Sequence, residues 1–233
     1  MTTKPLGGKA YGSTPHLPGS RMGPGDHHCH DGQATICTSR ARDRHDRVIV
    51  TEKLDGCCMS VARIGKNILA LGRAGYPADS APYEHMRIFS GWVRERESVF
   101  ASLLKDGERV VGEWMAMAHG TIYRLWHEPF VAFALVGGDG RVPHDCATDR
   151  FFKFGIPTAC VLSDGPPMPI DRAMRALGDR GFHGAQEEPE GAVWRVERRG
   201  KFDFLAKYVR PSKIDGKYLP NISGNDPIWN WTP

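Results

Sequence analysis

The chain has 233 residues, which is enough for a hydrophobic core and favours a single domain over 1–233. Its 40% hydrophobic and 25% charged content is typical of a soluble globular protein, and no apolar run approaches the ~18 residues of a membrane helix. The N-terminal stretch lacks an apolar signal region and the six cysteines form no C-x-x-C pair, so we expect a reducing, cytoplasmic setting.

The predicted elements follow in chain order. Residues 1–45 are rich in Gly, Pro and His and are expected to be irregular. Short apolar runs bounded by turn residues predict strands at 47–51, 57–64, 67–71, 109–115, 130–136, 192–197 and 202–209. Apolar residues at mostly helical spacing predict one helix at 83–104 and another at 170–177, before a C-terminal tail at 211–233. Strands without regular βα alternation indicate an α+β fold with mainly antiparallel sheets.

The motif Lys-x-Asp-Gly occurs twice, at Lys53 and at Lys213. One occurrence arises by chance in roughly one of twenty chains of this length, so the motif alone identifies nothing. The first copy follows the apolar run VIVTE, which places Lys53 at a rigid strand end, and Gly56 is free to adopt a tight turn. The second copy lies in a polar stretch next to proline, so we expect Lys213 to lie in a surface turn.

Further motifs follow Lys53 in a fixed order: VVGEWM with Glu113, FVAFALVG with Phe133, EGAVWRVE with Glu190 and FLAKYVRP with Lys207. This series, over about 51–210, resembles the covalent nucleotidyltransferases, which include DNA ligases, RNA ligases and mRNA capping enzymes. The TEKLDG context and the GEWMAMAHG block are most similar to ATP-dependent RNA ligases. The resemblance implies a nucleotidyltransferase domain of mainly antiparallel sheets flanked by helices, with the ATP pocket between them. Only 26 residues follow Lys207 (233 minus 207), fewer than the ~50 of a separate domain, so no OB domain is expected.

The resemblance also implies a reaction. Lys53 would attack the α-phosphate of ATP and hold AMP covalently, the AMP would pass to an RNA 5′-phosphate, and a 3′-hydroxyl would seal the strand. A lysine amine has an ordinary pKa near 10.4, so its neighbours must favour the neutral form. Partial burial, a Mg²⁺ or Mn²⁺ ion and the charge of Lys207 would act in that direction.

By the same resemblance, other residues would bind the nucleotide. Glu190 would hold the metal, Glu113 would contact the ribose, Phe133 would stack on adenine and Glu52 would help to position adenine. Arg73 would contact AMP or the incoming strand, or would be a solvated hairpin arginine.

The sequence departs from the family pattern at two places. The last motif usually carries two lysines separated by one residue, whereas Lys207 has Leu205 before it and Val209 after it. Either Lys201 or Arg210 would compensate for the missing cation, or the rate of one step would suffer. An acidic residue usually follows the aromatic residue of the third motif, and here Ala134 follows Phe133.

Alternatives remain open at this point. The chain could be a DNA ligase, a GTP-using capping-type enzyme, or a nucleotide-binding or RNA-binding module without turnover. A partner chain or homodimer would supply further nucleic-acid contacts, and Trp229 and Trp231 would stack on bases or pack on the body. The segment GDHHCHDG is interpreted as a flexible surface loop rather than a metal site, because adjacent ligands seldom converge on one ion. Two basic clusters, at 40–47 and 195–201, are solvated faces or phosphate contacts.

Overall fold

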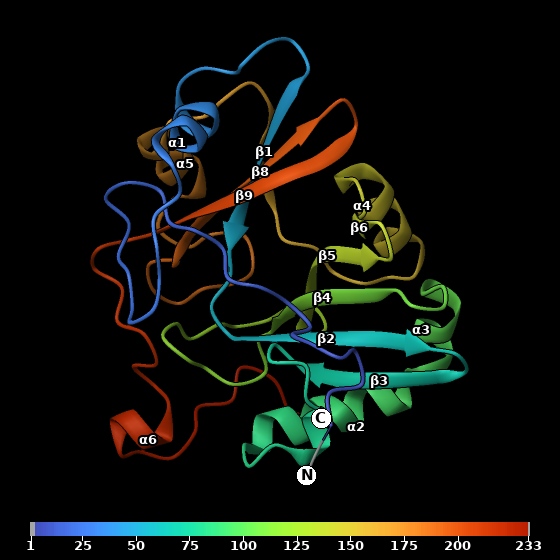
Figure 1. The fold of residues 1–233 in the computed structure, drawn as a ribbon. Helices are drawn as coiled ribbons and strands as arrows, with labels where there is room; N and C mark the ends of the chain where they lie inside the picture. The colour runs from blue at the N-terminus through green and yellow to red at the C-terminus, as the bar shows by residue number, and fades with distance from the viewer. Residues whose placement is uncertain (1–2, 233) are drawn as a thin grey trace. The chain divides into compact units, whose positions relative to one another are not determined.

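The structure is a computed structural model that describes residues 3–232. Its contacts divide into two compact units, each built on one sheet whose neighbouring strands are all antiparallel (Figure 1). The five-stranded unit comprises 3–12, 57–117 and 127–158, and the four-stranded unit comprises 13–56, 118–126 and 159–232. The prediction of an α+β fold with antiparallel sheets is confirmed.

The sheet of the five-stranded unit has the order β3-β2-β4-β5-β6. Its strands are β2 (Cys57–Ile64), β3 (Asn67–Gly72), β4 (Arg109–Trp114), β5 (Phe130–Gly137) and β6 (Gly140–Arg141). Its helices are η1 (Ala78–Ser80), α2 (Glu84–Glu95), α3 (Glu97–Leu103) and α4 (His144–Lys153). Large aromatic side chains form the core, with Phe89 against Trp114 at 5.1 Å and against Phe130 at 5.4 Å between ring centroids. The helix predicted at 83–104 is divided at Arg96, whose backbone is not helical (φ −111°, ψ 21°).

The sheet of the four-stranded unit has the order β7-β1-β8-β9. Its strands are β1 (Asp46–Lys53), β7 (Val161–Gly165), β8 (Gly191–Arg198) and β9 (Lys201–Val209), and its helices are α1 (Asp31–Thr38), α5 (Ile170–Leu177) and α6 (Pro220–Ser223). α1 and α5 pack on one face of this sheet, where Val50, Trp194 and Ala206 are fully buried. The indole Nε1 of Trp194 donates to the Met168 carbonyl at 2.9 Å, which satisfies the one polar group of this buried side chain.

Several elements were not predicted. α1 lies inside the segment 1–45 that was expected to be irregular, and α4 and β7 were missed as well. The α1 sequence DGQATICT contains Gly and two Thr residues of low helix propensity, so its stability comes from burial of Ile36 and Cys37 rather than from an obvious periodic pattern. No helix within 3–232 is long and apolar enough to cross a membrane.

Candidate functional site

Lys53 is the last residue of β1, an inner strand of its sheet, so its backbone is held by hydrogen bonds to strand neighbours. Its Nζ donates to Glu190 Oε2 at 2.7 Å and to the Leu54 carbonyl at 3.3 Å. The Lys53 side chain is 21% exposed and that of Glu190 is 9% exposed. The amine therefore lies at a rigid strand end, partly open and bonded to a buried carboxylate.

Glu190 directly precedes β8, and its segment is held by Arg210. The Arg210 backbone N–H donates to the Glu190 carbonyl at 2.9 Å, and its Nε donates to the Pro189 carbonyl at 3.1 Å. Burial raises the pKa of the Glu190 carboxyl, and the neighbouring Lys53 charge opposes that rise. Arg210 also pairs with Glu188 at 2.8 Å, so it braces this segment and is not a spare cation for the last motif.

Asp55 and Lys213, the aspartate of the first K-x-D-G and the lysine of the second, form an ion pair of 2.5 Å. Asp55 Oδ2 also accepts the Gly120 N–H at 3.0 Å, and Lys213 Nζ donates to the Thr121 hydroxyl. Lys213 is only 8% exposed. The prediction of a surface turn at Lys213 is wrong, because the chain after β9 returns this side chain to the turn that follows Lys53.

Lys207 lies on the same face of the sheet as Lys53. Thr51 pairs with Val193, Val193 pairs with Lys207, and Lys53 is two residues beyond Thr51. Lys201 is exposed at the start of β9, six residues and roughly 20 Å along the strand from Lys207, so it does not substitute for a second cation near Lys207.

Asp26 and His16, from the Gly- and His-rich segment, lie beside Lys207. Asp26 Oδ1 is 3.7 Å from Lys207 Nζ, and Asp26 Oδ2 is 3.0 Å from His16 Nε2. Burial and the Lys207 charge both lower the pKa of His16. Among residues 3–232 no cluster of three His, Cys, Asp or Glu side chains is suited to a metal. His16 pairs with Lys207 of β9, and the GDHHCHDG segment pairs with His16 in turn through His28.

Glu52 precedes Lys53, and strand alternation directs its side chain to the opposite face of the sheet. It is 2% exposed, and its Oε2 accepts the Phe182 N–H at 2.9 Å. Burial raises the pKa of Glu52 to about 7, although the Phe182 N–H acts in the other direction. Gly181 has φ +57°, and a Cβ there would lie 2.1 Å from Glu52 Oε1, so only glycine allows this close approach.

Arg73, Glu113 and Phe133 belong to the five-stranded unit. Arg73 follows β3 and its Nη2 donates to the Gly12 carbonyl at 3.1 Å. Glu113 lies in β4. Phe133 lies in β5, and its ring packs edge-to-face against Tyr11 with 5.3 Å between the ring centroids. Within each unit the structure thus supplies fixed positions for these side chains, and their roles towards a nucleotide stay predictions.

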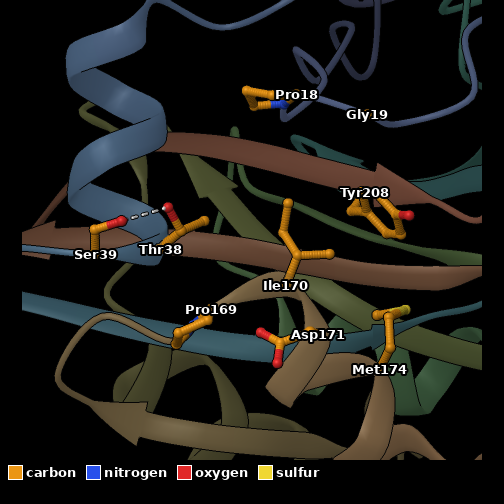
Figure 2. A pocket seen from close by; sticks show the side chains of 9 residues that line it. All are labelled: Pro18, Gly19, Thr38, Ser39, Pro169, Ile170, Asp171, Met174 and Tyr208. Carbon is orange, nitrogen blue, oxygen red and sulfur yellow. Dashed lines mark hydrogen bonds between the residues drawn. The ribbon is translucent and has the colours of Figure 1, made fainter.

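A separate pocket of about 530 Å³ lies on the side of the four-stranded sheet that α1 and α5 cover (Figure 2). It is lined by Pro18, Gly19, Thr38, Ser39, Pro169, Ile170, Asp171, Met174 and Tyr208. Tyr208 follows Lys207 in β9 and therefore points to the other face. None of the predicted site residues lines this pocket.

A family model described as RNA ligase matches residues 46–209. The chain belongs to the RNA ligase family. The match begins at β1 and ends at β9, so Lys53, Glu190 and Lys207 lie inside it. Lys213, Asp26 and His16 lie outside it and were missed as site residues; the repeated K-x-D-G motif was the one sequence signal that pointed to Lys213.

Solved structures of another RNA ligase family member share the fold. An aspartate-to-alanine variant of the Naegleria gruberi RNA ligase in the apo form is similar at TM-score 0.60 and 12% identity, over 96% of this chain and 60% of that one. A glutamate-to-alanine variant with ATP and Mn has a TM-score of 0.59 and 12% sequence identity, over 88% of this chain and 58% of that one. Another glutamate-to-alanine variant, with AMP and Mn, has a TM-score of 0.59 and 13% sequence identity, over 87% of this chain and 58% of that one. This chain thus spans about three fifths of the length of these proteins, and no curated protein matched its sequence.

Proposed function

We propose that the protein is an ATP-dependent RNA ligase that works through a covalent lysyl-AMP intermediate. The observation that carries the proposal is Lys53 at the end of β1, bonded to Glu190 at 2.7 Å, with Lys207 on the same face of the sheet. A primary amine next to a carboxylate and a second cation provides a nucleophile for phosphorus and positive charge for the phosphate oxygens.

The reaction balances over three steps. Lys53 Nζ forms a bond to the α-phosphorus of ATP as the bond to pyrophosphate breaks; the ammonium group releases two protons to solvent and keeps one N–H in the phosphoramide. An oxygen of the RNA 5′-phosphate then takes the AMP from Lys53, which leaves a pyrophosphate-linked RNA end. Finally, a 3′-hydroxyl attacks the RNA 5′-phosphorus, and AMP departs as the strand is sealed.

Glu190 controls when Lys53 is able to react. A carboxylate that accepts a hydrogen bond from Nζ stabilises the charged ammonium form of Lys53, and an ammonium group has no lone pair for attack. The nucleophile therefore requires that Glu190 be engaged elsewhere or that the bond lengthen as ATP enters. Lys207, held near Asp26, adds a second positive charge on this face.

A divalent cation suits the chemistry of the Glu190 carboxylate. Mg²⁺ prefers hard oxygen ligands and usually keeps several waters, so one protein carboxylate together with nucleotide phosphates is a sufficient donor set. That fits the lack of a three-residue ligand cluster among residues 3–232. When bound, Mg²⁺ or Mn²⁺ would neutralise charge on the phosphate oxygens. The Naegleria gruberi structures with ATP or AMP and Mn support this choice of cofactor.

The remaining residues would recognise the nucleotide and the RNA. In the proposal Glu113 contacts the ribose, Phe133 stacks on adenine, Arg73 contacts AMP or the incoming strand, and Glu52 supports the adenine side of β1. The RNA partner carries a 5′-phosphate on one end and a 3′-hydroxyl on the other. Membership of the RNA ligase family supports RNA over DNA as substrate.

Intact-mass measurement tests the first step. The protein is incubated with ATP and Mg²⁺, beside GTP and beside the variants Lys53→Ala and Lys66→Ala, the latter an exposed lysine in the turn after β2. We expect the added mass of one AMP with ATP only, in the wild type and in Lys66→Ala, and no adduct in Lys53→Ala. An adduct that persists in Lys53→Ala would overturn the assignment. Absence of any adduct, with Mn²⁺ and after pyrophosphate treatment as well, would favour a binding module without turnover.

A further inference from the structure

The ion pair between Asp55 and Lys213 connects the two K-x-D-G motifs of the chain. Their side chains meet at 2.5 Å although 158 residues separate them (213 minus 55). Lys53 ends β1 and Asp55 lies two residues further on, so Lys213 of the second motif contacts the segment that directly follows Lys53 of the first. Lys213 lies beyond residue 209, where the family match ends.

Hydrogen bonds from three neighbouring residues support this ion pair. Lys213 Nζ meets Asp55 and the Thr121 hydroxyl, while Asp55 Oδ2 also accepts the Gly120 N–H at 3.0 Å. The Tyr123 hydroxyl accepts the Asp55 backbone N–H at 3.2 Å. A buried ion pair is retained only when hydrogen bonds of this kind complete it, because removing two charges from water is expensive.

The residues around the ion pair are packed so closely that there is no space for a side chain at Gly120. A Cβ on Gly120 would lie 2.6 Å from the Ile214 carbonyl, 2.8 Å from Asp55 Oδ2 and 2.9 Å from Lys213 Cε. Real Cβ atoms do not approach so closely, so the segment around Gly120, the turn at Asp55 and the chain at Lys213 fix one another. A general role as a surface ion pair does not explain such closure, since exposed pairs adopt several arrangements.

We propose that Lys213 is a positioning residue for the lysine nucleophile and acts through Asp55. Lys213 compensates the Asp55 charge and holds the Leu54–Gly56 segment, so that Asp55 is engaged while Lys53 Nζ bonds to Glu190. Without Lys213, an uncompensated carboxylate would lie two residues from Lys53 and would compete with Glu190 for its ammonium group. This inference rests on the proposed function, because Lys53 acts as nucleophile only in that reaction.

The first test separates the steps of ligation in Lys213→Met, which keeps most of the side-chain volume without its charge. Covalent AMP capture needs Lys53, whereas sealing of RNA that already carries AMP on its 5′-phosphate does not. We expect AMP capture to fall at least 30-fold and sealing of pre-adenylylated RNA to stay within threefold of wild type. Lys217→Met is the matched control, because Lys217 is an exposed lysine in the same segment, paired with Glu187 at 2.8 Å; both its rates should stay within threefold. Equal loss of both steps in Lys213→Met, or no loss of capture, would overturn the proposal.

The second test asks whether Lys213 acts through Asp55. In an Asp55→Asn background, the further change Lys213→Met should alter AMP capture by less than threefold, because the carboxylate that Lys213 compensates is already gone. A drop of tenfold or more in that background would show a role independent of Asp55. The comparison of Asp55→Asn with the Asp55→Asn/Lys213→Met double variant remains informative if Lys213→Met alone does not fold, because the double variant leaves no buried charge at this pair.

The two hypotheses fail in different ways. If wild-type protein captures no AMP, the proposed function fails. If wild-type protein captures AMP and Lys213→Met captures it equally fast, the inference about Lys213 fails while the proposed function stands.

Discussion

Glu52 and Lys53 are adjacent residues that the sheet places in opposite environments. Lys53 ends on the partly open face and contacts Glu190, whereas Glu52 is 2% exposed and contacts the Phe182 N–H. One hydrogen bond does not replace the hydration that a carboxylate loses on burial, so the protonated form of Glu52 is favoured in the folded state. The sequence motif places both Glu52 and Lys53 at the nucleotide. The structure shows in addition that Glu52 is a buried titratable group on the opposite side of the sheet from Lys53.

The raised pKa of Glu52 makes stability depend on pH. Because this pKa rises to about 7 in the folded state from an ordinary value of 4.5, folded protein binds more protons than unfolded protein between these values. The contribution is therefore present below about pH 4.5 and is lost as the pH rises to about 7. In Glu52→Gln, we expect the decline in unfolding free energy between pH 5 and pH 8 to be smaller by on the order of 2 kcal/mol.

Urea denaturation at pH 5, 6, 7 and 8 measures this difference. Glu97→Gln, which changes an exposed glutamate of α3, should retain the wild-type profile. Identical profiles for Glu52→Gln and wild type would show that Glu52 does not titrate in this range.

At the scale of the element, the close approach of β8 and β9 holds Glu190 next to Lys53. A Cβ on Gly191 would lie 1.9 Å from the Tyr208 carbonyl oxygen, which is backbone and has no room to move. Gly191→Ala should therefore separate the strand ends and displace Glu190. We expect a loss of about 2 kcal/mol or more in unfolding free energy and at least a tenfold slower AMP capture, measured by urea denaturation and by intact mass.

A glycine of α1 provides the opposite case. Gly32 is exposed in the helix, and an added Cβ would meet no atom within 4 Å. Gly32→Ala should raise the unfolding free energy by about 0.5–1 kcal/mol, because alanine loses less conformational freedom in a helix. AMP capture should stay unchanged; a destabilised Gly32→Ala variant would mean that α1 does not form as described.

Across the whole molecule, sequence patterns predicted the inner strands far better than the long-range contacts. The strand at 57–64 and the helix at 170–177 were predicted with the observed bounds, because apolar periodicity and turn residues mark both. α1 and α4 are stabilised by burial against their sheets, which no local pattern reveals. Lys53, Glu190 and Lys207 were recognisable as motifs, but the pairing of Asp55 with Lys213 depends on how the chain returns after β9.

Folding also brings arginines of the two basic clusters next to carboxylates. Four of the eight Lys and Arg residues in the basic clusters at 40–47 and 195–201 pair with carboxylates within the four-stranded unit: Arg42 with Asp46 and Asp203, Arg47 with Asp164, Arg195 with Glu197, and Arg198 with Asp43 and Asp46. These arginines would have to leave a carboxylate before they contacted a phosphate. These pairs reduce the positive surface that the two clusters offer to RNA.

This pairing predicts a shallow salt dependence for RNA binding. Each phosphate contact to a single strand contributes about −0.7 to the slope of log K against log salt concentration. If the proposed ligase contacts RNA mainly near the reacting ends, fewer than about four phosphates are involved and the slope should be no steeper than about −3. Fluorescence anisotropy of a 5′-phosphorylated RNA between 50 and 200 mM salt measures it, with Arg42→Ala and Arg198→Ala as variants. Both variants should bind within twofold of wild type, since their arginines are occupied by carboxylates; a slope near −6, reduced by either variant, would instead identify these clusters as a phosphate track.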